Sequence, residues 1–239
     1  MSKLRPLFGN RRSELLINFM VSFVDRFVDT DDPDLLEGFR DLFGDESLSF
    51  RKVWAGLKGL EREDAIVEAY CQGLKKNGNY TFVGSSIVLD PSANQTYYRL
   101  IYATHHLEGM RVFREVEMKA HAEQESIRAE LAQVKRIAKT GMADLFEPTV
   151  LSSNYDASLV SRYQSKSLDA VQLQLKKAES IPYDRLEQVA LSFPLTSATQ
   201  LKDWLMDWKT QGKLNIEGLK KNQRRPKHSS GHVLRWAKQ

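Results

Sequence analysis

Apolar positions along the chain alternate between long stretches at helical spacing and short extended runs. The first run, Ser13 to Met20, is mostly apolar over the length of a strand, which is typical of a strand buried on both faces in a parallel sheet. Apolar residues at helical spacing then predict three helices, at residues 21–29, 35–43 and 62–76. Asp31-Asp32-Pro33 is a start signal for the second of these helices, and Asn77-Gly78-Asn79 is a stop signal for the third. A short helical or irregular link is expected between residues 49 and 60.

Two β-rich runs follow, Tyr80 to Leu89 and Thr96 to Thr104. The residues between them, Asp90-Pro91-Ser92-Ala93-Asn94, all favour turns, so the pattern predicts an antiparallel hairpin. A long helix is expected from Met110 to about Lys139, with an apolar first part and a highly charged later part that projects from the body. From Gly141 to Ile181 the apolar periodicity weakens, and within this stretch it predicts a helix only for residues 168–178.

The last 57 residues show a compact series of signals. Helical spacing covers Tyr183 to Leu191, and Ser197 to Gln200 fits a capping box that opens a helix ending at Gly212. Alternating residues 214–219 predict an edge strand, and 232–236 predict a second strand after a basic loop. The order of helix, turn, helix, strand, basic loop and strand is the layout of a winged helix-turn-helix.

Charge is distributed unevenly. From Tyr183 to Gln239 there are 11 Lys and Arg against 5 Asp and Glu, whereas the other 182 residues hold 24 basic and 26 acidic side chains. A basic module attached to a near-neutral body is typical of a protein that meets nucleic acid, and the alternative is a solubilising tail.

DNA is the partner that these cations favour, because each one that replaces a condensed counterion on the phosphate backbone strengthens binding. A winged helix places its second helix in the major groove and its wing along the backbone. Acidic Asp203 and Asp207 on the same helix favour the alternative, a module that binds protein or dimerises. The expected nucleic-acid-binding residues are Thr199, Gln200, Lys202, Lys220, Lys221, Arg224, Arg225 and Lys227.

Other site chemistry has little support. The single cysteine, Cys71, lies in an apolar helical pattern and is expected to be a buried small hydrophobe. Adjacent His105-His106 has no carboxylate at ligand spacing, so we expect strand-end residues and no metal site. The chain has no Gly-rich phosphate loop, no GxSxG and no HExxH motif. We therefore predict no catalytic residue in this chain.

The start of the chain contains no continuous apolar core of a signal peptide, and Leu15 to Val24 is too short to span a bilayer. We therefore expect a cytoplasmic protein with no membrane partner.

Several sequence stretches in succession resemble the three-Cys-motif partner proteins: Ser13 to Met20, Leu42-Phe43-Gly44, Ala69-Tyr70-Cys71, and Thr96 to His106. Gly212-Lys213-Leu214 and Arg225-Pro226-Lys227 resemble the winged-helix domain that often closes members of that family. The resemblance covers most of the chain in the right order. It implies an α/β fold: the C-terminal half of a Rossmann-like, class I methyltransferase-type sheet that ends in an antiparallel hairpin, followed by the small winged helix.

The resemblance also implies what is missing. Family members have an N-terminal half with a methyl-donor motif and an Asp-Pro-Phe-Gly-type motif before the strand matching Leu15 to Met20, and neither is present. No S-adenosylmethionine-binding residue can be assigned, and a cofactor would require a missing N-terminal half. Half of a parallel sheet would expose an apolar edge, which predicts partner binding or poor solubility.

We therefore expect three regions: a partial methyltransferase-like domain at 1–140, a helical linker at 141–182 and the winged helix at 183–239. The leading hypothesis is a binding component that contacts DNA and acts with another chain. That chain is a separate N-terminal half or the radical-SAM-like protein with three cysteines that the family partners. The alternatives are a subunit or fragment of an S-adenosylmethionine-dependent methyltransferase-like enzyme, inactive alone, and a non-functional remnant.

Overall fold

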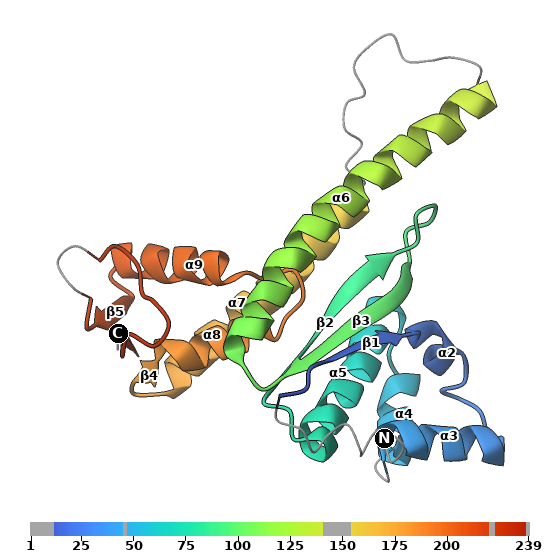
Figure 1. The fold of residues 1–239 in the computed structure, drawn as a ribbon, viewed down its shortest axis with the longest axis horizontal. Coiled ribbons are helices and arrows are strands. Elements are labelled where there is room, and N and C mark those ends of the chain that lie inside the picture. Colours follow the sequence, from blue (N-terminus) through green and yellow to red (C-terminus); the bar gives the residue numbers. More distant parts are fainter. Residues whose placement is uncertain (1–11, 45–46, 141–153, 220–222, 238–239) are drawn as a thin grey trace. The chain divides into compact units, whose positions relative to one another are not determined.

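The computed structural model describes residues 12–44, 47–140, 154–219 and 223–237. The protein is mixed α/β, and it divides into two compact units, residues 1–110 and 111–239, with a three-stranded antiparallel sheet in each (Figure 1). Each unit is described by itself. The division lies thirty residues before the predicted one at residue 140, because most of the long helix belongs to the second unit.

The sheet of the first unit contains β1 (Leu15–Phe19), β2 (Phe82–Leu89) and β3 (Thr96–Thr104) in the order β1-β3-β2. The predicted hairpin is confirmed, since β2 and β3 pair antiparallel. Asp90 forms the expected turn between them and accepts a hydrogen bond from the Ser92 amide over 2.7 Å. Strand β3 is also antiparallel to β1, so β1 and β2 run in the same direction on either side of it.

The prediction that the first strand is buried on both faces is wrong. Burial alternates along β1: Phe19 is buried, whereas Leu16 is 63% exposed and Asn18 is exposed. The reason is that only one face of β1 packs against the helices of the unit, a condition that a short apolar run does not reveal.

Four helices follow the pattern of the sequence, namely α2 (Val21–Arg26), α3 (Pro33–Phe43), α4 (Ser47–Ala55) and α5 (Gly59–Gly78). The predicted helix start is confirmed, because Asp32 is the N-cap of α3 and its carboxylate accepts the Asp34 amide hydrogen bond at 3.0 Å. The predicted stop is also confirmed. Asn79 caps α5 in the left-handed conformation, with φ of 54°.

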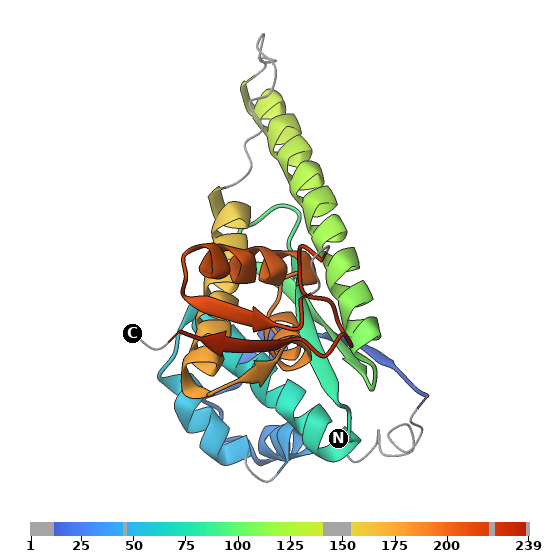
Figure 2. The ribbon, with the colours of Figure 1, turned by 90° about the vertical axis from the view of Figure 1, so that its left-hand side faces the viewer.

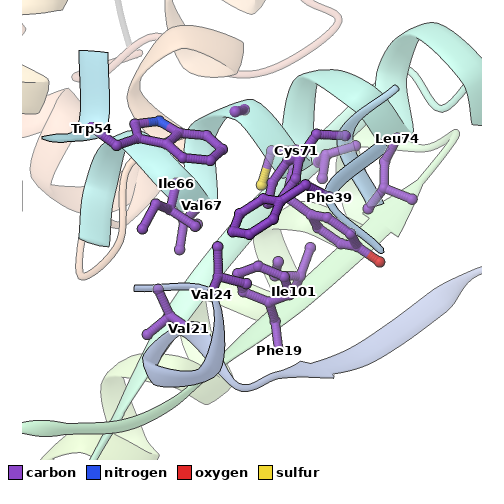
Figure 3. Close-up of a cluster of buried hydrophobic side chains, with 14 of the residues drawn as sticks. Phe19, Val21, Val24, Phe39, Trp54, Ile66, Val67, Cys71, Leu74 and Ile101 are labelled. Atoms are coloured by element: carbon purple, nitrogen blue, oxygen red, sulfur yellow. The ribbon is translucent and has the colours of Figure 1, made fainter. Parts of the chain in front are cut away.

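The core of the first unit lies between these helices and one face of the sheet. Helix α5 contributes Ile66, Val67, Cys71 and Leu74, and the strands contribute residues such as Phe19 and Ile101 (Figure 3). Cys71 is buried there, as predicted. Aromatic rings fill the remaining space: Phe43 meets the edge of Trp54 at 5.0 Å between ring centroids, and Phe19 stacks on Tyr70 at 4.6 Å.

The second unit is built from helices with a small sheet. Helix α6 (Leu107–Thr140) enters it at Arg111, and α7 (Asn154–Lys177), α8 (Tyr183–Leu191) and α9 (Ala198–Thr210) follow. Strands β4 (Ile181–Pro182), β5 (Leu214–Glu217) and β6 (Val233–Trp236) form a sheet in the order β4-β6-β5, with α9 lying along it (Figure 2). Helices α8 and α9 and the two later strands were predicted, whereas β4 was not.

Helix α7 is part of the second core and is not a linker, which corrects the prediction for residues 141–182. Its Val171 and Leu175 are completely or almost completely buried against Leu186 of α8 and Leu201 of α9. The second unit therefore includes α7 as well as the segment 183–239. Residues 141–153 lie outside the described part of the chain.

Within the described residues, none of the helices combines the length and the apolar character needed to cross a membrane.

Candidate nucleic-acid interface

The first turn of α9 presents polar residues at a capped helix end. Ser197 is the N-cap, and its hydroxyl accepts a hydrogen bond from the Gln200 backbone amide at 3.2 Å, which confirms the predicted N-cap of the capping box. Thr199 is exposed, whereas Gln200 and Lys202 are half-buried. The opposite side of the helix is fixed in the core by Leu201, Leu205 and Trp208. The polar residues are therefore held on a rigid support.

The β5–β6 loop, residues 218–232, carries the predicted cations. Arg224, Arg225 and Lys227 are exposed, and Lys220 and Lys221 lie outside the described residues. Arg225 turns back to α9, where its guanidinium contacts the Asp203 carboxylate at 2.7 Å. This contact brings the basic loop and the exposed side of α9 into one surface, although Asp203 neutralises part of its positive charge.

His228 anchors the same loop to α8. Its Nδ1 lies 3.0 Å from the Asp184 carboxylate and 3.1 Å from the Glu187 carboxylate. The Ser229 amide also donates to Asp184, at 3.0 Å. The loop is therefore fixed at two points, by Arg225 to α9 and by His228 to α8.

Asp184, Glu187 and His228 are near enough together to suggest a metal site, with ligand atoms within 4.8 Å of one another. The arrangement argues against that use. Arg111 donates to both oxygens of Glu187, through Nε at 3.0 Å and through Nη2 at 2.6 Å. Because a guanidinium already neutralises this buried carboxylate, a cation bound beside it would meet repulsion. We interpret the cluster as structural.

Tyr183 completes the surroundings of Glu187. Its hydroxyl donates to the carboxylate at 3.2 Å, and the ring is buried. Burial, followed by the negative charge of Glu187, raises the pKa of Tyr183 far above its ordinary value. Tyr183 therefore remains a neutral hydrogen-bond donor, and Glu187 is held by groups from three segments of the unit.

A second buried pair controls the turn between α8 and α9. Arg114 and Glu117 of α6 are both buried and contact each other at 2.6 Å. Arg114 donates to the Leu191 carbonyl at the end of α8, and Glu117 accepts the Leu195 amide hydrogen bond at 3.0 Å. Backbone groups that a helix end and a tight turn leave unpaired are thereby satisfied, and the position of α9 relative to α8 is fixed.

Sequence reasoning missed these charged residues, although their spacing contains a signal. Glu187 lies on the apolar face of its helix, since Tyr183, Leu186 and Ala190 are buried at i−4, i−1 and i+3. Arg114 and Glu117 likewise follow Met110 at the spacing of a core face. Opposite charges at core positions indicate buried partners and can be recognised without a structure.

The adjacent histidines lie where strand β3 ends. The His106 amide donates to the Thr104 hydroxyl at 3.1 Å, and the His105 ring stacks on Tyr80 with 4.8 Å between centroids. Thr104 also donates to the Glu14 carboxylate at 2.9 Å, and Gly109 lies so near that an added Cβ would be 2.6 Å from the Tyr102 hydroxyl. This end of the sheet is a tightly packed polar cluster.

Comparison of the chain with protein-family models, with curated proteins and with solved structures found no match.

Proposed function

We propose that the second unit is a winged helix-turn-helix that binds duplex DNA, with α9 as its recognition helix and the β5–β6 loop as its wing. The order α7, β4, α8, α9, β5, β6 supports this proposal, because a winged helix consists of a helix, a strand, two helices and a strand–wing–strand unit. The sheet order β4-β6-β5 also agrees, since the last strand of such a module pairs between the other two.

The observation that carries the proposal is the contact between Arg225 and Asp203. It joins the wing to the recognition helix, so the basic side chains and the exposed polar residues of α9 can face one duplex. Lys202 and Gln200 can donate hydrogen bonds to acceptor atoms on base edges in the major groove. The exposed cations Arg224 and Lys227 can contact the adjacent phosphates. Phosphate contacts of this kind position a protein without specifying sequence.

The test is binding of the full chain to a labelled duplex at several salt concentrations. We expect affinity to fall linearly with salt on logarithmic axes, and the double variant Arg224→Ala/Lys227→Ala to reduce the slope by about 0.9 for each phosphate that the protein no longer neutralises. A matched control is Lys52→Ala/Lys58→Ala, which removes two exposed cations from the first unit. Absence of binding at low salt, or equal effects of both double variants, would reject the proposal.

A second candidate function is supported by the first unit. Strand β3 lies antiparallel between β1 and β2, which run in the same direction, as at the end of a class I methyltransferase sheet. This topology agrees with the resemblance to the three-Cys-motif partner proteins. On this alternative the chain is a subunit or fragment of a methyltransferase-like enzyme, and its partner supplies the S-adenosylmethionine site.

Titration calorimetry with S-adenosylmethionine tests this alternative. Because the donor site would lie in the partner, the full chain alone should produce no heat of binding, a result that both candidates predict. Saturable heat from the chain alone would contradict the need for a partner and would show a donor site within this chain.

A further inference from the structure

Helix α6 exposes a stripe of apolar residues along most of its length. Val116 is 56% exposed, Ile127 45%, Leu131 38% and Val134 61%. Ala120 and Ala138 are also exposed and continue the stripe at the same helical spacing. Scattered apolar residues are ordinary on a surface, but a continuous stripe on one side of a helix indicates an interface.

The spacing of these residues is that of a coiled-coil seam. Ile127, Leu131, Val134 and Ala138 follow one another at intervals of four, three and four, which is the alternation of heptad positions d and a. Ala120 extends the pattern by one heptad toward the start of the helix, with Gln124 at an a position. The stripe from 116 to 138 is about 33 Å long at the rise of an α-helix.

The stripe is distinct from the side of α6 that already has a partner. His121 and Arg128 are buried on that side, and Arg128 contacts Asp156 of α7 at 3.6 Å. Packing within the described part of the unit therefore covers one side of α6 and leaves the stripe in solvent.

The charges beside the stripe specify the partner. Glu123 and Glu130 occupy the g positions on one flank, and Arg128 and Lys135 occupy the e positions on the other. In a parallel pair of identical helices, g of one chain faces the following e of the other, so Glu130 meets Lys135 of its partner. Arg128 is not available to Glu123 of the partner, because it is buried and contacts Asp156 of α7, so the charge argument rests on Glu130 and Lys135. An antiparallel pair would place the g flank opposite itself, so Glu would face Glu and Lys135 would lose its carboxylate partner.

We propose that α6 binds α6 of a second copy of this chain in a parallel, two-stranded coiled coil centred on Ile127, Leu131 and Val134. The inference does not depend on DNA binding, since it uses only the stripe and its flanking charges. If the second unit binds DNA, the dimer would present two recognition helices and would suit a site with two half-sites.

Sedimentation equilibrium of the full chain tests the proposal. We expect a dimer at micromolar concentration, and Ile127→Asp/Leu131→Asp should raise the dissociation constant roughly a hundredfold, because each carboxylate would be buried at the seam. The matched control is Leu173→Asp on α7, an exposed leucine outside the stripe, which should leave the mass unchanged. Far-UV circular dichroism verifies that each variant is folded.

Charge reversal and a cysteine pair test the orientation. Glu130→Lys and Lys135→Glu should each weaken the dimer by about tenfold, and their combination should restore it. Val134→Cys should form a covalent dimer on mild oxidation, whereas Arg136→Cys, on the opposite side of the helix, should not. A monomer at all concentrations, a dimer unaffected by the seam variant, or single reversals without effect would overturn the proposal.

Discussion

The two units differ in what they bury. In the first unit the core is apolar and rich in aromatic residues, with Trp54 and Phe43 in edge contact, and the fully buried Arg99 contacts Glu63 and Asp64 at 3.2 Å. In the second unit both members of an ion pair lie in the interior: Arg114 and Glu117 contact each other and, like Glu187, are almost completely inaccessible to solvent, whereas the carboxylates that Arg99 contacts are 20–21% exposed. Each of these groups contacts a segment from another element.

Buried charged pairs mark the part of the molecule in which the geometry must be fixed. Apolar packing stabilises a fold but tolerates exchange between residues of similar volume. A buried ion pair contributes little net stability, yet removing one partner leaves an uncompensated charge. In the second unit the Arg114–Glu117 pair holds the α8–α9 turn, and the buried Glu187 carboxylate, paired with Arg111, holds His228 of the β5–β6 loop. These are the segments that carry the proposed interface.

The largest loss of stability is expected from breaking the Arg114–Glu117 pair that holds the α8–α9 turn. Glu117→Leu leaves the Arg114 guanidinium buried without its carboxylate and should lower the free energy of unfolding of the second unit by about 3–5 kcal/mol. Urea denaturation measures the decrease, and hydrogen exchange assigns it to a unit. The double variant Arg114→Met/Glu117→Leu should recover only the part caused by the unpaired guanidinium, because the Leu191 carbonyl and the Leu195 amide also lose their partners. Equal decreases for both variants would mean that these lost backbone hydrogen bonds matter more than the uncompensated charge.

A cavity in the first core should have a slightly smaller effect. Leu74 of α5 is fully buried, so Leu74→Ala should cost about 3 kcal/mol. Hydrogen exchange should quicken in the first unit and remain unchanged in the peptides of α8 and α9. If the peptides of both units lose protection together, the two units unfold as one and the comparison between them fails.

A methyl group at Gly109 tests the polar cluster at the sheet end. The added Cβ would lie 2.6 Å from the Tyr102 hydroxyl and 3.0 Å from the Glu14 carboxylate. Gly109→Ala should therefore lower the melting temperature and reduce stability by about 1–3 kcal/mol, since side chains that already bond one another must move. Gly38→Ala is the matched control, because an added Cβ there meets nothing within 4 Å.

The same cluster makes stability depend on alkaline pH. Burial and the hydrogen bond with Glu14 raise the pKa of Tyr102 from 10.0 to about 12. Between these values the unfolded chain loses the phenolic proton while the folded chain retains it, so stability is present below pH 10 and is lost as pH rises toward 12. Tyr102→Phe should reduce the loss of unfolding free energy between pH 10 and 12, as measured by urea denaturation at each pH. An unchanged pH profile would show that other groups cause it.

Much of the local structure could be predicted, because it depends on neighbouring residues. The bounds of α8 coincide with the predicted Tyr183 to Leu191, and the Ser197 cap follows from residues three positions apart. Helix α7 was predicted only in part. Its buried apolar residues follow one another at intervals of four or eight positions: Leu159, Tyr163, Val171 and Leu175. Buried Ser167 interrupts this apolar series. Its hydroxyl is satisfied by the Ala190 carbonyl, a distant contact that no local pattern shows.

The other features that the sequence did not predict also depend on contacts between distant segments. Strand β4 has two residues, which is too short for any periodicity, and it exists because Ile181 and Pro182 pair with β6. The wing cations could be located from composition, but their partners could not. The contact of Arg225 with Asp203 joins segments more than twenty residues apart, and it decides how much positive charge the surface presents.

That contact can be broken to determine whether α9 and the β5–β6 loop form a DNA-binding surface. Asp203→Asn removes an acid from the surface and releases Arg225, whereas Asp169→Asn removes an exposed acid from α7. In fluorescence anisotropy with a labelled duplex, we predict that only Asp203→Asn binds more tightly, by about threefold at low salt, with a salt slope steeper by about 0.9. Unchanged or weaker binding by Asp203→Asn, or equal gains in both variants, would contradict DNA binding by this surface.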